Sequence, residues 1–112
     1  MKTAAFEVSQ LLQNHSGFDK DGWQEFFRNE ALFAGVYVLT PGGEDTQDPH
    51  AEDEIYYVLE GQGELVSWEG ERETRQSAHA GSVLFVSREV RHRFENFSAG
   101  LKLLVFFATN PK

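Results

Sequence analysis

The sequence predicts an all-β protein, built as an antiparallel sandwich or barrel. Three observations lead to this fold class. Short apolar segments alternate with turn residues at the close spacing of antiparallel strands, and no sustained helical period appears. With 112 residues, of which 40% are hydrophobic, the chain is long enough for one real core and too short for two domains.

Most of the expected strands are runs of β-branched and aromatic residues that end at a turn. The run at 32–40 stops at a Pro-Gly-Gly turn, and Ile-Tyr-Tyr-Val-Leu at 55–59 favours a pleated, mostly buried strand. Glu69 and Gly70 predict the turn of a hairpin. The other strands are expected at 64–68, 72–75, 82–86, 90–96 and 101–109.

The segment before the first of these strands has a different character. Residues 3–14 carry a weak amphipathic pattern, which predicts one short helix or an ordered arm. Trp23, Phe26 and Phe27 are too apolar to leave in water. They are expected to cover one end of the barrel or pack in its core; the alternative is that they form part of a dimer surface.

Composition excludes several functions. A net charge of -8 disfavours non-specific binding to nucleic acid or to an anionic membrane, since both call for a basic face. The absence of cysteine excludes disulfides and thiolate metal sites. The longest apolar run, 101–108, is far below the ~18 residues of a membrane span, and the first residues lack the apolar run of a signal peptide. A cytoplasmic protein is therefore expected.

Two stretches carry the residues that could hold a metal. Asp48, His50 and Glu54 lie at the mouth of the predicted strand 55–59, and His92 lies far downstream in another predicted strand. Residues two apart in a strand share a face, so Asp48 and His50 are expected to point the same way, and Glu54 keeps that parity if no bulge intervenes.

The first stretch resembles a motif of the cupin family, small β-barrel proteins with a metal inside the barrel. That motif runs glycine, His-x-His, three or four residues, Glu, six residues, Gly. His50 fills the second histidine slot, with three residues before Glu54 and six between Glu54 and Gly61. Asp48 departs from the pattern, since it stands where the first histidine belongs.

The second stretch resembles the second cupin motif, which begins with glycine and ends His-x-x-x-Asn. Gly81, His92 and Asn96 fit its spacing, and Asn96 is expected to hydrogen-bond the backbone of a turn. Ser87 stands in place of the usual proline and Glu89 in place of a second glycine.

The resemblance implies a jelly-roll barrel and a small cupin of bacterial type. The whole chain, 1–112, is then a single cupin domain, with 1–29 as the N-terminal arm and 30–109 as the barrel. Small cupins commonly pair, and the chain carries more aromatic surface than one barrel readily hides, so a homodimer is expected. The aromatic residues in question are Trp23, Phe26, Phe27, Phe33, Phe106 and Phe107.

The resemblance also implies one divalent metal ion per chain, held by His50, Glu54 and His92. Two histidines and one carboxylate suit Fe(II) and leave coordination positions open. Asp48 is expected as a fourth ligand, with Gln47 as its rival because Pro49 could disturb simple alternation. The nitrogen and oxygen donors favour Fe, Mn or Zn, with Ni possible.

Other residues of the motifs have two readings. If Glu54 points inward, Tyr56 does too; it is a candidate catalytic group, although core packing is the commoner fate of a strand tyrosine. Tyr57 would then face the other layer or a partner chain. His15 and His79 lie in turn-like segments outside the motifs and are expected on the surface.

Arginines gather around the second motif, and acids around the first. Arg88, Arg91 and Arg93 could neutralise the acids across the surface, or one of them could hold a substrate carboxylate. Arg91 and Arg93 have the opposite parity to His92, which favours the surface role.

These features favour a metalloenzyme that acts on a small molecule inside the barrel, most plausibly a dioxygenase. The alternatives are a non-catalytic metal- or ligand-binding module and a redox-neutral isomerase or lyase. Fold alone does not choose among them.

Overall fold

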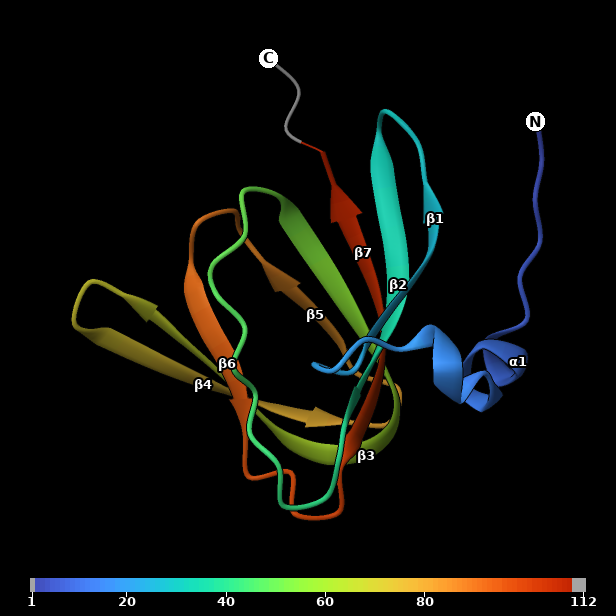
Figure 1. Cartoon of the computed structure of the whole chain (residues 1–112). Coiled ribbons are helices and arrows are strands. Elements are labelled where there is room, and N and C mark those ends of the chain that lie inside the picture. Colours follow the sequence, from blue (N-terminus) through green and yellow to red (C-terminus); the bar gives the residue numbers. More distant parts are fainter. Residues whose placement is uncertain (1, 110–112) are drawn as a thin grey trace.

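The computed structural model describes residues 2–109, which form one short helix and seven strands (Figure 1). No helix among the described residues is long and apolar enough to cross a membrane. The elements, in chain order, are helix α1 (Val8–Gln13), a 3-10 turn (His15–Gly17), and strands β1 (Trp23–Arg28), β2 (Leu32–Leu39), β3 (Asp53–Glu69), β4 (Arg72–His79), β5 (Val83–Val86), β6 (Arg91–Glu95) and β7 (Leu101–Ala108).

Strand β3 organises the sheet, because it pairs with four other strands along its 17 residues. Its first half lies between β5 and β7, and its second half lies between β4 and β6. Strands β2 and β1 follow β7 outward, so the order is β1-β2-β7-β3-β4. All pairings are antiparallel, and the sheet curls without closing into a complete barrel, which confirms the predicted fold class.

The sequence predicts two strands, 55–59 and 64–68, where the structure has one bent strand. The pairing of β3 with β7 shifts register between Val58 and Glu60, and Gly61 has a φ of 97°. The bulge and the glycine turn the strand from one half of the sheet into the other. In the sequence, Gly61 predicts the end of a strand, because glycine weakens a strand interior.

The core lies inside the curl, where alternate residues of the strands meet. In β3, Glu54, Tyr56 and Val58 are buried while Ile55 and Tyr57 are exposed. The inward residues of β7 and β6 complete the core, namely Leu101, Leu103, Val105, Phe107 and Phe94. One carboxylate, that of Glu54, therefore sits among aromatic and aliphatic side chains.

Part of the predicted N-terminal arm belongs to the sheet. Strand β1 pairs with β2 and forms an edge of the sheet, although residues 1–29 were expected outside the barrel. Trp23 packs edge-on against Phe107 of the core, which agrees with the expected core packing. Phe26 and Phe27 instead contact Phe6 of the arm.

The helix is attached to this edge through one buried amide. Gln24 in β1 donates from Nε2 to the carbonyl of Leu11 at 2.7 Å and accepts from Nδ2 of Asn14 at 3.2 Å. Helix α1 has no side-chain capping hydrogen bond and buries no residue. The arm is therefore held mainly from the sheet side.

A long loop, residues 40–52, joins β2 to β3 and passes beside β6 (Figure 1). Two contacts tie it there. The backbone N–H of Phe94 donates to Asp45 Oδ2 at 2.8 Å, and the N–H of Glu89 donates to the carbonyl of His50 at 2.7 Å. The loop therefore brings His50 to the open end of the curled sheet, next to β6.

Candidate metal centre

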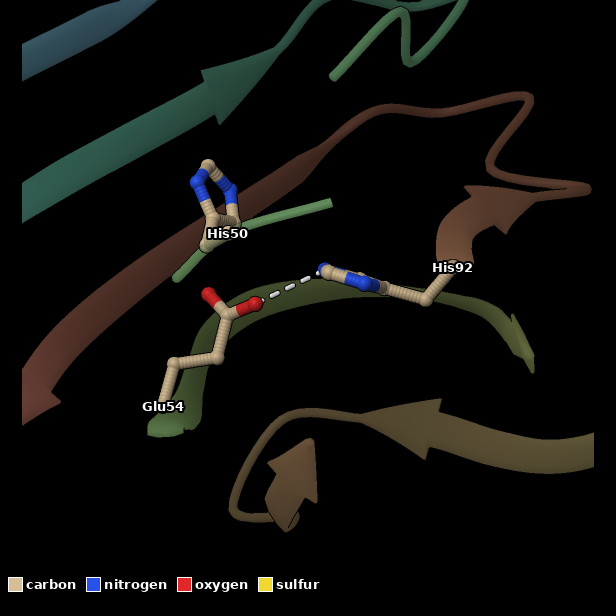
Figure 2. A group of neighbouring side chains, drawn as sticks. All are labelled: His50, Glu54 and His92. Atoms are coloured by element: carbon tan, nitrogen blue, oxygen red, sulfur yellow. Dashed lines mark ion pairs between the residues drawn. The ribbon is translucent and has the colours of Figure 1, made fainter. Parts of the chain in front are cut away.

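Three residues from three segments turn their side chains toward one another (Figure 2). His50 comes from the long loop, Glu54 from the start of β3 and His92 from β6. Their ligand atoms all lie within 4.8 Å of one another. The structure thus brings together three of the four residues predicted as ligands.

The carboxylate of Glu54 is the central feature of this cluster. Its side chain is 1% exposed, and neither oxygen accepts a well-aligned hydrogen bond from a described residue. Its ion-pair partner is His92, whose Nε2 lies 2.8 Å from Oε1. A buried carboxylate without hydrogen bonds costs several kcal/mol unless a cation compensates it.

The orientation of His92 is fixed from behind. Nδ1 lies 2.9 Å from the carbonyl oxygen of Val90, and because a carbonyl only accepts, Nδ1 carries a hydrogen. Nε2 then faces Glu54 and Tyr56. Burial opposes a charge on His92, but the Glu54 carboxylate and the Val90 carbonyl outweigh it, so the pKa of His92 is raised.

This is the arrangement of a metal-binding histidine. A carbonyl that accepts from the far nitrogen holds the ring and leaves the near nitrogen free to bind a cation. Without a cation, a proton on Nε2 serves the same purpose, and it would pair with Glu54.

Tyr56 lies within the cluster, as its predicted parity requires. It is 1% exposed, and its hydroxyl oxygen lies 3.0 Å from His92 Nε2 and donates to Gln47 Oε1 at 3.0 Å. Burial first, and then the negative charge of Glu54, raise the pKa of Tyr56 well above its usual value. The phenol therefore keeps its proton at neutral pH and acts as a donor.

Asp48, the fourth predicted ligand, is not in the cluster. Its side chain is exposed, and it lies at the rim of the adjoining cavity. Its rival Gln47 approaches instead, with Oε1 at 3.1 Å from His50 Nε2. The expectation from strand parity fails here because residues 40–52 form a loop, in which successive side chains do not alternate.

The other residues that the sequence singles out lie at the surface. His15 and His79 are exposed, as expected, and Tyr57 points outward. Asn96 differs, because it donates to the side chain of Glu64 and not to a turn backbone.

The arginines of the second motif serve the outer surface. Arg91 and Arg93 stack on Trp68, with guanidinium carbons 4.2 and 5.4 Å from the ring centroid. Arg93 also pairs with Glu95 at 2.6 Å. Both residues project away from the His50–Glu54–His92 cluster, which agrees with the surface role.

A cavity of about 380 Å³ opens beside the cluster. Aromatic rings form much of its wall: Phe33 stacks on Phe107 at 4.6 Å, and His50 lies edge-on to Phe107 at 5.0 Å. The full lining is Asp19, Asp21, Trp23, Phe33, Tyr37, Thr46, Gln47, Asp48, Pro49, His50, Tyr56, Val105 and Phe107. It contains acids but no Lys or Arg.

The cluster fits a divalent metal ion. Two atoms that are each about 2.1 Å from one ion and at right angles lie about 3.0 Å apart, and Glu54 Oε1 and His92 Nε2 are 2.8 Å apart. The donors are nitrogen and oxygen only, and the orphaned carboxylate needs a positive partner. The residues present therefore suit the ion that the sequence predicts.

Comparison with known proteins places this chain in one family. The sequence profile described as "Cupin domain" matches residues 35–107. An uncharacterized protein of Streptomyces coelicolor is 35% identical over 104 residues, which cover 93% of this chain and 94% of that protein.

Solved structures show the same fold. A Cupin 2 conserved barrel domain protein from Salinispora arenicola superposes with a TM-score of 0.69 and 21% identity, covering 96% of this chain and 87% of that one. The enzyme HppE in its Fe(II) form superposes with a TM-score of 0.63 and 22% sequence identity. The match covers 76% of this chain but only 48% of HppE. By its profile match, this chain belongs to the cupin family.

Proposed function

We propose that this protein is a metal-dependent cupin enzyme of oxygenase type, with one divalent ion held by His50, Glu54 and His92. The observation that carries the proposal is the buried carboxylate of Glu54, which has no aligned hydrogen bond and faces two histidines. Burying such a group is costly, and a cation bound between the carboxylate and the two histidines would offset that cost.

The identity of the ion follows from the donor set. Two imidazoles and one carboxylate are the set used by non-haem Fe(II) oxygenases, and they also accept Mn(II) and Zn(II). HppE, which shares the fold, has been crystallised with Fe(II) and with Co(II). The proposal takes iron as the working metal.

The cavity suggests the class of substrate. Its aromatic walls suit a flat apolar skeleton, and its acids, Asp19, Asp21 and Asp48, disfavour an anion. No Lys or Arg lines this cavity to pair with a carboxylate or phosphonate group. We therefore infer a neutral aromatic or enolic compound, without an anionic group at the end that lies near these acids.

The residues of the chain have separate parts in this reaction. A ferrous ion at the site would supply the redox chemistry by which dioxygen is activated. Phe33 and Phe107 exclude water from the reacting atoms, and the Val90 carbonyl keeps the His92 ring in place. Tyr56, with its raised pKa, would donate a hydrogen bond or a proton to an oxygen of the substrate.

A comparison of metal forms with and without oxygen tests the proposal. Protein stripped of metal is reloaded with Fe(II) or with Zn(II) and mixed with catechols, flavonols and diketones. The iron form is expected to consume oxygen, and the zinc form is not. Equal turnover by the zinc form without oxygen would identify an isomerase or lyase.

A non-catalytic module is the second candidate, and the same experiment addresses it. The observation in its favour is that Gln47 and Tyr56 already crowd the cluster, which leaves fewer open positions. Tight binding of panel compounds without turnover in any metal form would support this function over the enzyme.

A further inference from the structure

Gln47 is held in one orientation by a buried carboxylate. Asp45 is 7% exposed, and its Oδ2 accepts from Nε2 of Gln47 at 2.7 Å. Because carboxylate oxygens accept and do not donate, the amide nitrogen of Gln47 must face Asp45. The amide oxygen is thereby turned to the opposite side.

Asp45 is itself fixed from two other segments. Tyr37 in β2 donates its hydroxyl hydrogen to Oδ1 at 2.7 Å, and the backbone N–H of Phe94 in β6 donates to Oδ2 at 2.8 Å. Burial, followed by the charge of Asp45, raises the pKa of Tyr37, so this phenol stays a donor. The loop cannot turn Gln47 over without breaking this network.

The oxygen of Gln47 points into the metal cluster. Oε1 lies 3.1 Å from Nε2 of His50 and 3.0 Å from the hydroxyl of Tyr56, which is 3.0 Å from Nε2 of His92. An amide oxygen is a ligand that Fe(II), Mn(II) and Zn(II) all accept alongside imidazole and carboxylate. Asp48, by contrast, is exposed.

We propose that Gln47 is the fourth protein ligand of the metal, and that Asp45 is a positioning residue which presents the amide oxygen rather than the nitrogen. This inference rests on the proposed metal site. It gives the ion one charged and three neutral donors, so the bound site is less negative than it would be with Asp48 as ligand.

The test uses metal-free protein and Co(II), whose visible absorption reports the number and type of its ligands. Wild type is titrated first, and its affinity is measured by competition with a chelator. Gln47→Leu, of similar volume, is expected to weaken Co(II) binding at least about tenfold and to change the absorption spectrum. Asp45→Asn is expected to weaken it about 10–100-fold, as is typical for a residue that orients a ligand.

Asp48→Asn is the matched control, since it removes a carboxylate from the residue that directly follows Gln47 in the loop. Its Co(II) affinity and absorption spectrum should equal those of wild type. The double variant Asp45→Asn/Gln47→Leu should bind no more weakly than Gln47→Leu alone, because Asp45 acts through Gln47. Near-UV circular dichroism verifies that each variant is folded. If Asp45→Asn does not fold, the Co(II) spectrum of Gln47→Leu alone tests the inference.

An unchanged Co(II) spectrum in folded Gln47→Leu would overturn the inference, even if affinity fell, because Gln47 would then act only through His50. A changed spectrum in Asp48→Asn would overturn it in favour of Asp48. Both results leave the proposed metal site standing. Wild type that binds no Co(II), Fe(II) or Zn(II) would refute the proposed function itself.

Discussion

Oε1 of Glu54 lies 2.8 Å from Nε2 of His92, in a position where both side chains are 1% exposed. At this distance two lone pairs would repel each other, so a positive charge must lie between the two atoms. In metal-free protein that charge is a proton on His92, and in the proposed metal-bound form it would be the ion. At the proposed site a metal would therefore replace a proton.

The first prediction concerns metal content. Protein prepared without chelator should carry close to one first-row divalent ion per chain, and Glu54→Gln or His92→Ala should remove most of it. His79→Ala, which changes an exposed histidine outside the site, should keep the full amount. Elemental analysis measures all four proteins, and metal retained by both site variants would contradict the assignment.

The second prediction is a pH dependence of opposite sign for the two forms. The folded pKa of His92 is raised above its unfolded value of about 6.5. Its ion pair with Glu54 thus stabilises the metal-free protein fully below that value, and this contribution is lost as pH rises through the folded pKa. Metal affinity should rise over the same window, because the proton must leave Nε2.

Thermal unfolding of metal-free protein and Zn(II) titrations, both from pH 5 to 9, measure the two trends. In His92→Ala the stabilising part of the first trend should disappear, while His79→Ala should follow wild type. A metal affinity that stays constant across this range would show that no proton is displaced.

Most of the strands follow from the sequence, and three of the predicted ligands lie together in the structure, for two reasons. His92 and Glu54 lie in strands, where alternation fixes which side chains face inward, and His50 follows from the motif spacing. Gln47 and Asp45 lie in a loop, where no period relates neighbours. Their roles depend on contacts with Tyr37 and Phe94, far away in the chain.

The N-terminal boundary was missed for a similar reason. Trp23, Phe26 and Phe27 are interrupted by polar residues, and the bulge between Glu25 and Phe27 breaks the alternation that marks a strand. Only the partner strand β2 shows that this segment extends the sheet. A loop or arm was therefore the natural interpretation of the sequence alone.

The third prediction is a homodimer formed through the outer face of β5, β3 and β7. This face exposes Val83 and Phe85 at 66% and 60%, and Ile55, Tyr57 and Phe106 lie beside them. This face differs from the set of aromatic residues that the sequence suggests for the interface, in which Phe107 is buried. Burying these side chains in a two-fold interface would remove a continuous apolar patch from water.

Light scattering at micromolar concentration should give a mass near twice 12.7 kDa for wild type. Phe85→Glu should give a single-chain mass, because a charge would be buried at the interface. Ser77→Glu places the same charge on the exposed strand β4 and should leave the dimer intact. A wild-type mass near 12.7 kDa would exclude a stable dimer.

The fourth prediction separates binding from chemistry at Tyr56. Tyr56→Phe removes the hydroxyl that lies 3.0 Å from His92 Nε2 but keeps the ring that packs against Phe94. Metal content should be nearly unchanged, while turnover of a panel substrate should fall about 100-fold if the phenol donates a proton. Unchanged turnover would leave Tyr56 as a core residue.

The last prediction concerns the bend of β3 that separates the two halves of the sheet. Gly61 has a φ of 97°, and a Cβ added there would lie 2.2 Å from the carbonyl oxygen of Gly100. Gly70 also has a positive φ, 66°, but a Cβ there would meet no atom within 4 Å. The two glycines thus separate the cost of backbone conformation from the cost of a steric overlap.

Gly70→Ala should lower the free energy of unfolding by about 1–2 kcal/mol, the cost of a left-handed residue with a Cβ. Gly61→Ala should lower it by at least about 3 kcal/mol, because backbone must move as well. Urea denaturation of both variants measures the difference. Equal losses would mean that the bend can relax without cost, and that Gly61 serves only as a conformational switch from one half of β3 to the other.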